Sequence, residues 1–326
     1  MSADQSKCIL AIDLGTSALK VALVTTDGQV AACESLPMQV TLLPRGGAEQ
    51  DPEDWWRGIV CAAKSLLAQN AVPANDVVAV SCSAQWSGTV AVDRDGHALM
   101  PAIIWMDSRG GPYVKQLTGG LIEIAGYGLR RLLTWVRMTG GAPAHSGKDP
   151  IAHILYIKHK RPEVYAATYK FLEPKDYLNL RLTGKFATSY DSIILHWVTD
   201  NRHISKIVYS ERLLKLAGID REKLPDLKPA VDLLGPIKPE VARELGLNEN
   251  VQVVMGTPDL QAAALGSGAI RDVESHLYIG TSSFLICHVP FKKIDLFRNM
   301  ASLPSPIPNR YFLANEQESA GICLTY

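Results

Sequence analysis

The chain has 326 residues, of which 47% are hydrophobic and 20% are charged. This composition is typical of a folded globular protein long enough for two domains, and it excludes a disordered chain. The 33 basic and 33 acidic residues cancel, so net charge gives no reason to expect nucleic acid or an anionic membrane as a partner.

The chain shows no sign of secretion or of a membrane span. Its six cysteines are scattered and form no C-x-x-C pair, which indicates reduced thiols in the core. The first residues lack the pattern of a signal peptide, and an acid and three arginines interrupt the most apolar long stretch, residues 121–138. We therefore expect a cytosolic protein.

A β-hairpin is the first predicted element, over residues 8–24. Apolar strands flank Gly15-Thr16-Ser17, and Asp13 stands at the end of the first strand. Glycine lets the backbone approach a ligand, and amide and hydroxyl groups in such a turn suit phosphate oxygens. Asp13 is placed to hold a hydrated metal ion and Lys20 to add positive charge. The alternative is an ordinary hairpin with a turn of small residues.

Strands and an amphipathic helix follow in alternation. Residues 29–41 can supply a third strand, and Asp51 can cap a helix whose apolar face includes Trp56 and Leu66. Short apolar strands are expected over residues 77–83, 89–92 and 102–105. This alternation indicates an α/β fold, in which ligands commonly bind at the ends of strands.

Two of these strands run into side chains typical of a sugar or polyol site. Gln85 and Trp86 follow one strand, and Trp105, Asp107 and Arg109 end or follow another. Amide and carboxylate groups bind neighbouring hydroxyls in pairs, and indole faces stack on C–H surfaces. The alternatives are tryptophans that belong to the core and an Asp–Arg ion pair on the surface.

Residues 122–205 are expected to be mainly helices and loops, and residues 251–255 a buried strand. Gly256-Thr257-Pro258-Asp259 then leads into an alanine-rich helix. Asp259 stands at the start of this helix, where it is either an N-cap or a general base that accepts a proton from a substrate hydroxyl.

A second glycine hairpin repeats the first. Gly280-Thr281-Ser282 again lies between two apolar strands. Two phosphate-type hairpins in distant parts of one chain predict two similar halves that face a common nucleotide.

The motifs together resemble the FGGY carbohydrate kinases, and most closely their xylulokinase-like branch. They are D-L-G-T-S from Asp13 with Lys20, W-x-D-x-R from Trp105, P-K-D-Y-L from Pro174, G-x-x-D from Gly256 and G-T-S from Gly280. No P-loop or G-x-G-x-x-G motif occurs. The resemblance implies an α/β, actin-like (ribonuclease H-like) two-domain ATPase fold, with the active cleft between the domains.

The resemblance also implies an activity: ATP-dependent phosphorylation, with Mg²⁺, of a hydroxyl on a xylulose-like ketose or polyol. By the family's pattern, Asp259 is the general base, and Gln85, Trp86 and Asp259 contact the sugar. Asp13 helps to hold Mg²⁺, and the Gly15 and Gly280 hairpins hold the ATP phosphates.

The predicted domains are an N-terminal actin-like sugar-binding domain, residues 1–255, and a partial C-terminal one, residues 256–326. The family's second domain is longer, and its glycine-rich adenosine-binding segment has no counterpart here. We expect an incomplete second sheet whose exposed edge favours association into homo-oligomers. Two alternatives stay open: a non-catalytic sugar-binding or regulatory remnant, and an actin-like ATPase that acts on a protein partner.

Overall fold

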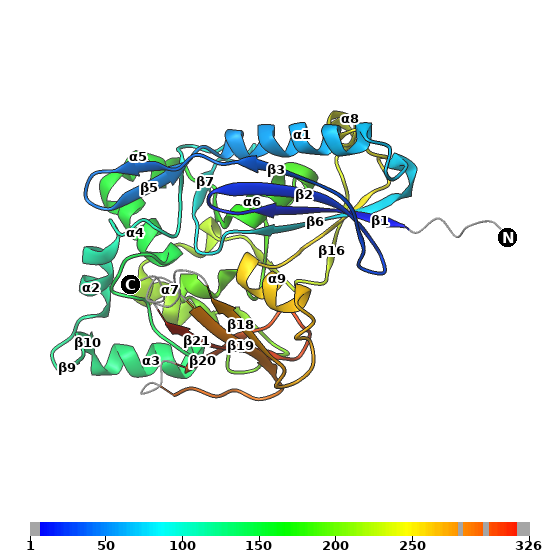
Figure 1. Ribbon diagram of the computed structural model, residues 1–326. Helices are drawn as coiled ribbons and strands as arrows, with labels where there is room; N and C mark the ends of the chain where they lie inside the picture. The colour runs from blue at the N-terminus through cyan, green and yellow to red at the C-terminus, as the bar shows by residue number, and fades with distance from the viewer. Residues whose placement is uncertain (1–6, 280–282, 296–299, 318–326) are drawn as a thin grey trace, which may run out of the picture.

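The computed structural model describes residues 7–279, 283–295 and 300–317, and its two main sheets lie one above the other in Figure 1. The first sheet has the strand order β16-β17-β6-β1-β2-β3. Its strands are β1 (Cys8–Leu14), β2 (Ala18–Thr25), β3 (Val30–Pro37), β6 (Val77–Ala84), β16 (Leu233–Pro236) and β17 (Gln252–Val254).

The first sheet combines an antiparallel meander with parallel strands. β1, β2 and β3 pair antiparallel, which confirms the predicted hairpin, and Asp13 lies opposite Lys20 in its register. β6 pairs parallel to β1, and β17 pairs parallel to β6. The carboxyl ends of β1, β6 and β17 therefore meet at one edge of the sheet.

Two helices pack directly against this sheet, α1 (Pro52–Ala68) and α6 (Pro174–Thr183), and α8 (Pro239–Leu245) packs against α1 and contributes to the same apolar core. α1 begins as predicted, because the Asp51 side chain accepts a hydrogen bond from the Glu53 N–H and Pro52 fills the first turn. α1 and α8 lie together along the top of the molecule in Figure 1. α6 is buried on nearly every side and ends at Gly184, which has the left-handed backbone (φ 74°) that glycine accepts without strain.

A second apolar cluster forms the core of the region that was predicted to be helices and loops. It gathers Trp135, Ile154, Phe171 and Leu213 with their neighbours. The helices of the region are α2 (Gly111–Thr118), α3 (Leu129–Thr139), α4 (Pro150–Lys160), α5 (Pro162–Ala167) and α7 (Glu211–Ala217), with 3₁₀ turns η1 (Ala74–Asp76), η2 (Ile193–His196) and η3 (Arg221–Lys223) in the chain.

Short strands join these helices in small sheets. They are β4 (Thr41–Leu43), β5 (Gly47–Gln50), β7 (Val90–Val92), β8 (Ala102–Ile103), β9 (Glu123–Ile124), β10 (Tyr127–Gly128), β11 (Lys170–Leu172), β12 (Ala187–Ser189), β13 (Thr199–Asp200), β14 (Val208–Tyr209) and β15 (Asp226–Lys228). Because β8 covers two residues only, the strand predicted over 102–105 stops before Trp105, which lies in the following turn.

The second main sheet is antiparallel, with the order β18-β19-β21-β20. Its strands are β18 (Ser275–Ile279), β19 (Ser283–Val289), β20 (Met300–Pro304) and β21 (Tyr311–Gln317), and α9 (Asp259–Gly266) precedes them. One face buries Ile286, Leu303 and Phe312 against Ala264 of α9. Leu277, Ile279 and Leu285 alternate with these residues and are about half exposed, so the opposite face of this sheet is apolar and open.

Across the described residues, none of the helices is both long enough and apolar enough to span a membrane.

Candidate active site

Three turns meet where the parallel strands of the first sheet end. β1 runs into Gly15-Thr16-Ser17, β6 into Gln85-Trp86-Ser87, and β17 into the turn before Asp259. The register pairs Leu14 with Ala84, so the first two turns leave the sheet at the same level. The edge predicted from the strand ends thus brings most of the candidate residues together.

The first turn is tight and presents an exposed acid. The Gly15 N–H donates to the Ala18 carbonyl at 3.0 Å, and a Cβ on Gly15 would lie 2.8 Å from that oxygen, so the hairpin itself requires glycine. The Asp13 side chain is 41% exposed, and its carboxylate lies 3.4 Å from the Lys20 ammonium. An accessible carboxylate of this kind is a suitable oxygen ligand for Mg²⁺.

A chain of hydrogen bonds links the first two turns to the Trp105 loop. The Trp105 indole N–H donates to the Thr16 hydroxyl at 2.8 Å, and this hydroxyl donates to the Gln85 amide oxygen at 3.0 Å. The Gln85 amide nitrogen donates in turn to Gln50 Oε1 at 2.6 Å. Gln85 is only 2% exposed and both ends of its amide bind protein groups, whereas the Trp105 ring is 39% exposed. Of these two candidates, only Trp105 has an accessible side chain.

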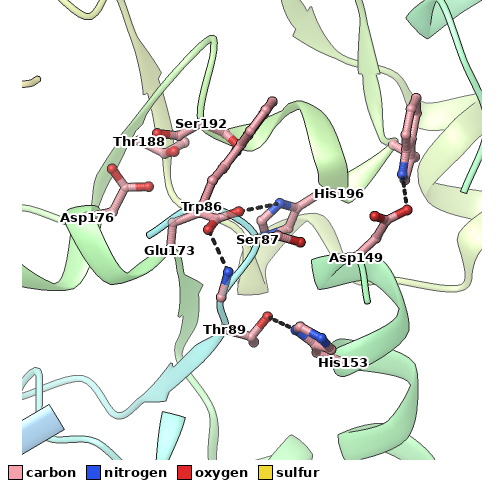
Figure 2. Close-up of polar contacts among 12 residues, drawn as sticks. Trp86, Ser87, Thr89, Asp149, His153, Glu173, Asp176, Thr188, Ser192 and His196 are labelled. Carbon is pink, nitrogen blue, oxygen red and sulfur yellow. Dashed lines mark hydrogen bonds and ion pairs between the residues drawn. The ribbon is translucent and has the colours of Figure 1, made fainter. Parts of the chain in front are cut away.

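Trp86 and Ser87 form a constrained turn after β6. The Trp86 indole packs against the apolar cluster of the second sheet, and its N–H donates to the Ser192 carbonyl at 3.0 Å. Ser87 has a positive φ of 65°, unusual for a residue other than glycine, and its hydroxyl donates to the Lys148 carbonyl. Figure 2 shows this turn beside Glu173 and His196, which are both buried.

Asp107 and Arg109 face each other and the protein interior. The Asp107 carboxylate accepts the Ala48 N–H at 3.0 Å and the Arg109 Nε–H at 2.8 Å. Arg109 also binds Glu49 at 2.6 Å and lies over the Tyr156 ring. Burial lowers the pKa of the Arg109 guanidinium, but the hydrogen bonds to Asp107 and Glu49 outweigh that effect and raise it. The pair is a buried network that supports the Trp105 loop, not the surface ion pair considered as the alternative.

Asp259 is the first residue of α9, and the N-cap residue is Pro258. The N-cap alternative for Asp259 is therefore wrong. Its carboxylate accepts the Leu260 N–H at 2.7 Å, and the Trp86 backbone N–H also acts to lower its pKa. Burial raises the pKa of Asp259 to about 6, and the negative charge of Asp13 adds to the rise while these N–H groups oppose it. A carboxyl group with this pKa is ionised at neutral pH and still basic enough to accept a proton.

Gln50, Glu173 and Asn179 were not proposed as site residues from the sequence, and Lys175 was noted only as part of the P-K-D-Y-L motif. The Gln50 amide oxygen accepts the hydrogen bond from Gln85 described above, and the Gln50 amide nitrogen donates to the Thr16 carbonyl at 2.9 Å. Glu173, Lys175 and Asn179 are buried at the start of α6. The available signal was the mixture of charged and amide side chains with Leu178, Leu180 and Leu182 in one short helix, since such polar residues are rarely buried without partners.

The second glycine hairpin, Gly280-Thr281-Ser282, lies outside the described residues. Its flanking strands, β18 and β19, pair as predicted, with Ile279 opposite Ser283.

Comparison with known proteins identifies close relatives. The family described as "FGGY family of carbohydrate kinases, N-terminal domain" matches residues 8–266. A xylulose kinase of Bacillus subtilis is 31% identical over 293 residues, which are 89% of this chain and 55% of that protein. A xylulose kinase of Escherichia coli is 30% identical over 320 residues, or 97% of this chain and 62% of that protein.

Solved structures agree with these matches in fold. A ligand-bound xylulose kinase from Lactobacillus acidophilus has a TM-score of 0.85 at 24% identity, and covers 98% of this chain and 61% of its own. A Plasmodium falciparum glycerol kinase with ADP has a TM-score of 0.84 at 18% identity, with 98% and 63% covered. These likenesses show the fold alone, and they confirm the expected actin-like (ribonuclease H-like) fold. The chain spans about 55 to 62% of the length of the curated relatives described above.

Proposed function

The chain belongs to the FGGY family of carbohydrate kinases, and on that premise we propose that it takes part in phosphoryl transfer from Mg·ATP to a hydroxyl of a ketose or polyol. The relatives that are named xylulose kinases favour a five-carbon ketose such as D-xylulose as the first compound to test. The domains behind this proposal are the predicted ones, residues 1–255 for the sugar and residues 256–326 for part of the nucleotide half.

One observation carries the proposal, the setting of Asp259. Its carboxylate accepts a hydrogen bond from the Leu260 N–H at the start of α9, and burial raises its pKa to about 6. In this proposal Asp259 accepts the proton of the sugar hydroxyl while that oxygen forms its bond to the γ-phosphorus and the bond to ADP breaks. Trp105 offers its exposed ring to the sugar, while Gln85, Asp107 and Arg109 hold the surrounding turns.

The residues at the end of β1 fit a magnesium ion with its phosphates. Asp13 offers an accessible carboxylate, and Lys20 brings a positive charge 3.4 Å from it. Asp13 would hold the ion, and Thr16, Ser17 and Lys20 would lie on its phosphate side, with the Gly280 hairpin as the predicted counterpart. A bound magnesium ion would supply neutralisation of the charge on the transferred phosphate.

The test is a pair of titrations followed by an assay on the full chain. Calorimetry with D-xylulose, other ketoses and polyols measures sugar binding, and ADP release with Mg·ATP measures transfer. We expect Asp259→Asn to leave the sugar Kd within a few-fold of the original and to lower kcat by about 10²–10⁴-fold. Asp95→Asn, an exposed carboxylate in a distant turn, is the matched control and should change neither.

Each outcome decides between the alternatives. Near-normal turnover of Asp259→Asn would contradict the assignment of the base. Sugar binding without any binding of ATP would favour the non-catalytic sugar-binding alternative, and ATP hydrolysis that does not depend on sugar would favour an ATPase that acts on another protein.

A further inference from the structure

The start of α6 buries a cluster of polar groups that the proposed chemistry does not use. Lys175, Asp176 and Asn179 are each at most 1% exposed. The Lys175 ammonium donates to Asp176 Oδ1 at 2.5 Å, so the buried charge has a partner. Buried ionic groups of this kind seldom improve stability over apolar side chains, which makes a role in fixing a particular geometry worth testing.

Two members of this cluster converge on one carbonyl. Lys175 Nζ donates to the Met255 carbonyl oxygen at 3.2 Å, and Asn179 Nδ2 donates to the same oxygen at 2.7 Å. Met255 follows β17 directly and lies four residues before Asp259. Its carbonyl is therefore the point at which α6 holds the turn that carries the proposed base.

The far side of the same turn is also held. The Thr257 hydroxyl donates to Asp191 Oδ2 at 2.5 Å, and Asp191 is fully buried. Between these two contacts lies Gly256, whose N–H donates to the Ala230 carbonyl at 3.0 Å. Polar contacts thus fix the turn before and after its glycine.

The first turn of α6 also holds the neighbouring turn of the site. Glu173 Oε2 accepts the Gly88 N–H at 3.0 Å, and its other oxygen lies 3.8 Å from His196 Nδ1 (Figure 2). Pro174 packs against Gly88 so closely that a Cβ there would lie 2.5 Å from the proline ring. One end of one helix therefore contacts both the turn that carries Trp86 and the turn that leads to Asp259.

We infer that Lys175 and Asn179 are positioning residues, which fix the Met255 carbonyl and so place Asp259 against the Trp86 turn. The inference rests on the proposed function of Asp259 as the base. A base must lie within hydrogen-bond reach of the hydroxyl that it deprotonates, and a misplacement of about 1 Å lowers the rate by about 10²-fold. Two donors on one carbonyl restrain the turn at the residue where the strand ends, before the glycine can act as a pivot.

The chain offers a matched pair of amides for the experiment. Asn179 and Asn201 are both fully buried, and each donates Nδ2 to a main-chain carbonyl, Asn201 to that of Thr139 at 3.4 Å. Asn201 lies in the loop after β13, outside the turns that form the site. Asn179→Ala and Asn201→Ala therefore remove the same kind of bond from the full chain in two different places.

Hydrogen exchange followed by mass spectrometry measures the restraint directly. We expect Asn179→Ala to speed exchange of the peptide that covers Val254–Leu260, including the Gly256 amide, by at least about 10-fold. Asn201→Ala should leave that peptide unchanged. In the kinase assay, Asn179→Ala should lower kcat by about 10–100-fold with KM changed by no more than a few-fold. Equal exchange of this peptide in both variants would overturn the inference.

A second variant covers the case in which Asn179→Ala does not fold. Lys175→Met combined with Asp176→Asn removes both charges together, so that no buried charge is left alone, and the same acceleration of the Val254–Leu260 peptide is expected. Exchange does not depend on turnover, so the two proposals fail separately. If Asp259→Asn keeps its turnover, the proposed base is wrong while faster exchange still supports the restraint; unchanged exchange overturns the restraint whatever Asp259 does.

Discussion

Asp13 and Asp259 stand after neighbouring parts of one sheet, yet their surroundings differ in almost every respect. Asp13 lies at the end of β1 with its side chain 41% exposed, and its partner at 3.4 Å is the exposed ammonium of Lys20. Asp259 lies beyond β17 on a turn fixed by Lys175, Asn179 and Asp191. The same edge of the sheet thus presents one acid that is open to water and one whose carboxylate is partly covered by the chain.

The difference shows how one fold can place one carboxylate to suit ion binding and another to suit proton transfer. A group that binds a hydrated ion benefits from access to water and from freedom to adapt. A group that accepts a proton benefits from burial, which raises the pKa toward neutrality, and from a fixed position. The contrast between the two turns is consistent with the metal and base roles that we propose, and it can be tested without any activity assay.

The largest expected effect comes from disturbing the fixed turn at its glycine. Gly256 has φ +72°, and a Cβ there would collide with the Cys82 carbonyl oxygen of β6. We expect Gly256→Ala to lower the free energy of unfolding by about 3 kcal/mol or more, from backbone strain together with the collision. Urea denaturation measures the change.

Gly268 supplies the control for Gly256. It has a similar φ of +86° but no atom within 4 Å of the position of a Cβ. Gly268→Ala should therefore cost only the backbone strain, about 1 kcal/mol. Equal losses in the two variants would show that the turn before Asp259 is not held closely against β6.

The next effect concerns the pH dependence of stability. The folded state holds the pKa of Asp259 at about 6, above the ordinary value of 3.8, so between these pH values the folded state binds more protons than the unfolded state. The stabilisation is complete below pH 3.8 and is lost as the pH rises through 6. Asp259→Asn cannot ionise, so its stability relative to the original chain should rise by about 1–3 kcal/mol between pH 4 and pH 8.

Urea denaturation of Asp259→Asn and of the original chain at pH 4, 6 and 8 measures this change. Parallel curves for Asp259→Asn and the original chain would mean that Asp259 is not desolvated.

The smallest effect on stability is expected in the turn after β1, which contains Thr16. Thr16→Val keeps the shape of the side chain but removes the hydroxyl that joins the Trp105 indole to the Gln85 amide. We expect a loss of about 1 kcal/mol in the free energy of unfolding, because the buried Gln85 oxygen loses a donor. Thr134→Val removes an exposed hydroxyl that donates to the Arg130 carbonyl and accepts a hydrogen bond from Arg212, and it should cost less because both bonds are exposed to water. A loss of 3 kcal/mol or more at Thr16 would mean that the first turn is as rigidly held as the second.

Much of the fold could be predicted because its signals are local. The hairpin over β1 and β2, the cap of α1 at Asp51, the ends of α6 and α7 at Gly184 and Gly218, and the start of α9 all follow from short sequence patterns. Apolar alternation and turn residues act within a few positions of the chain, so the sequence displays them directly. The strand over 102–105 was predicted too long, because pairing with β5 ends at Ile103.

The candidate site could be predicted as a set of residues but not as a set of roles. The turns after β1, β6 and β17 leave the same edge of the sheet, while the Gly280 turn that the motifs also name lies outside the described residues. The motifs did not distinguish Trp105, whose side chain is accessible, from Gln85, whose amide is bound at both ends by Thr16 and Gln50. They also did not indicate that Asp107 and Arg109 bind each other inside the protein.

The sequence by itself therefore determined the hairpin of β1 and β2, the start of α1, and the places of Asp13 at a strand end and Asp259 at a helix start, but not the short strands within residues 122–205. Only the tertiary structure decided which polar groups form hydrogen bonds within the protein and which remain accessible at the surface. Hydrogen-bond partners such as Met255 and Asn179, or Thr16 and Trp105, lie 76 and 89 residues apart. Burial and pairing depend on atoms brought together by the whole fold, and the difference between Asp13 and Asp259 depends on both.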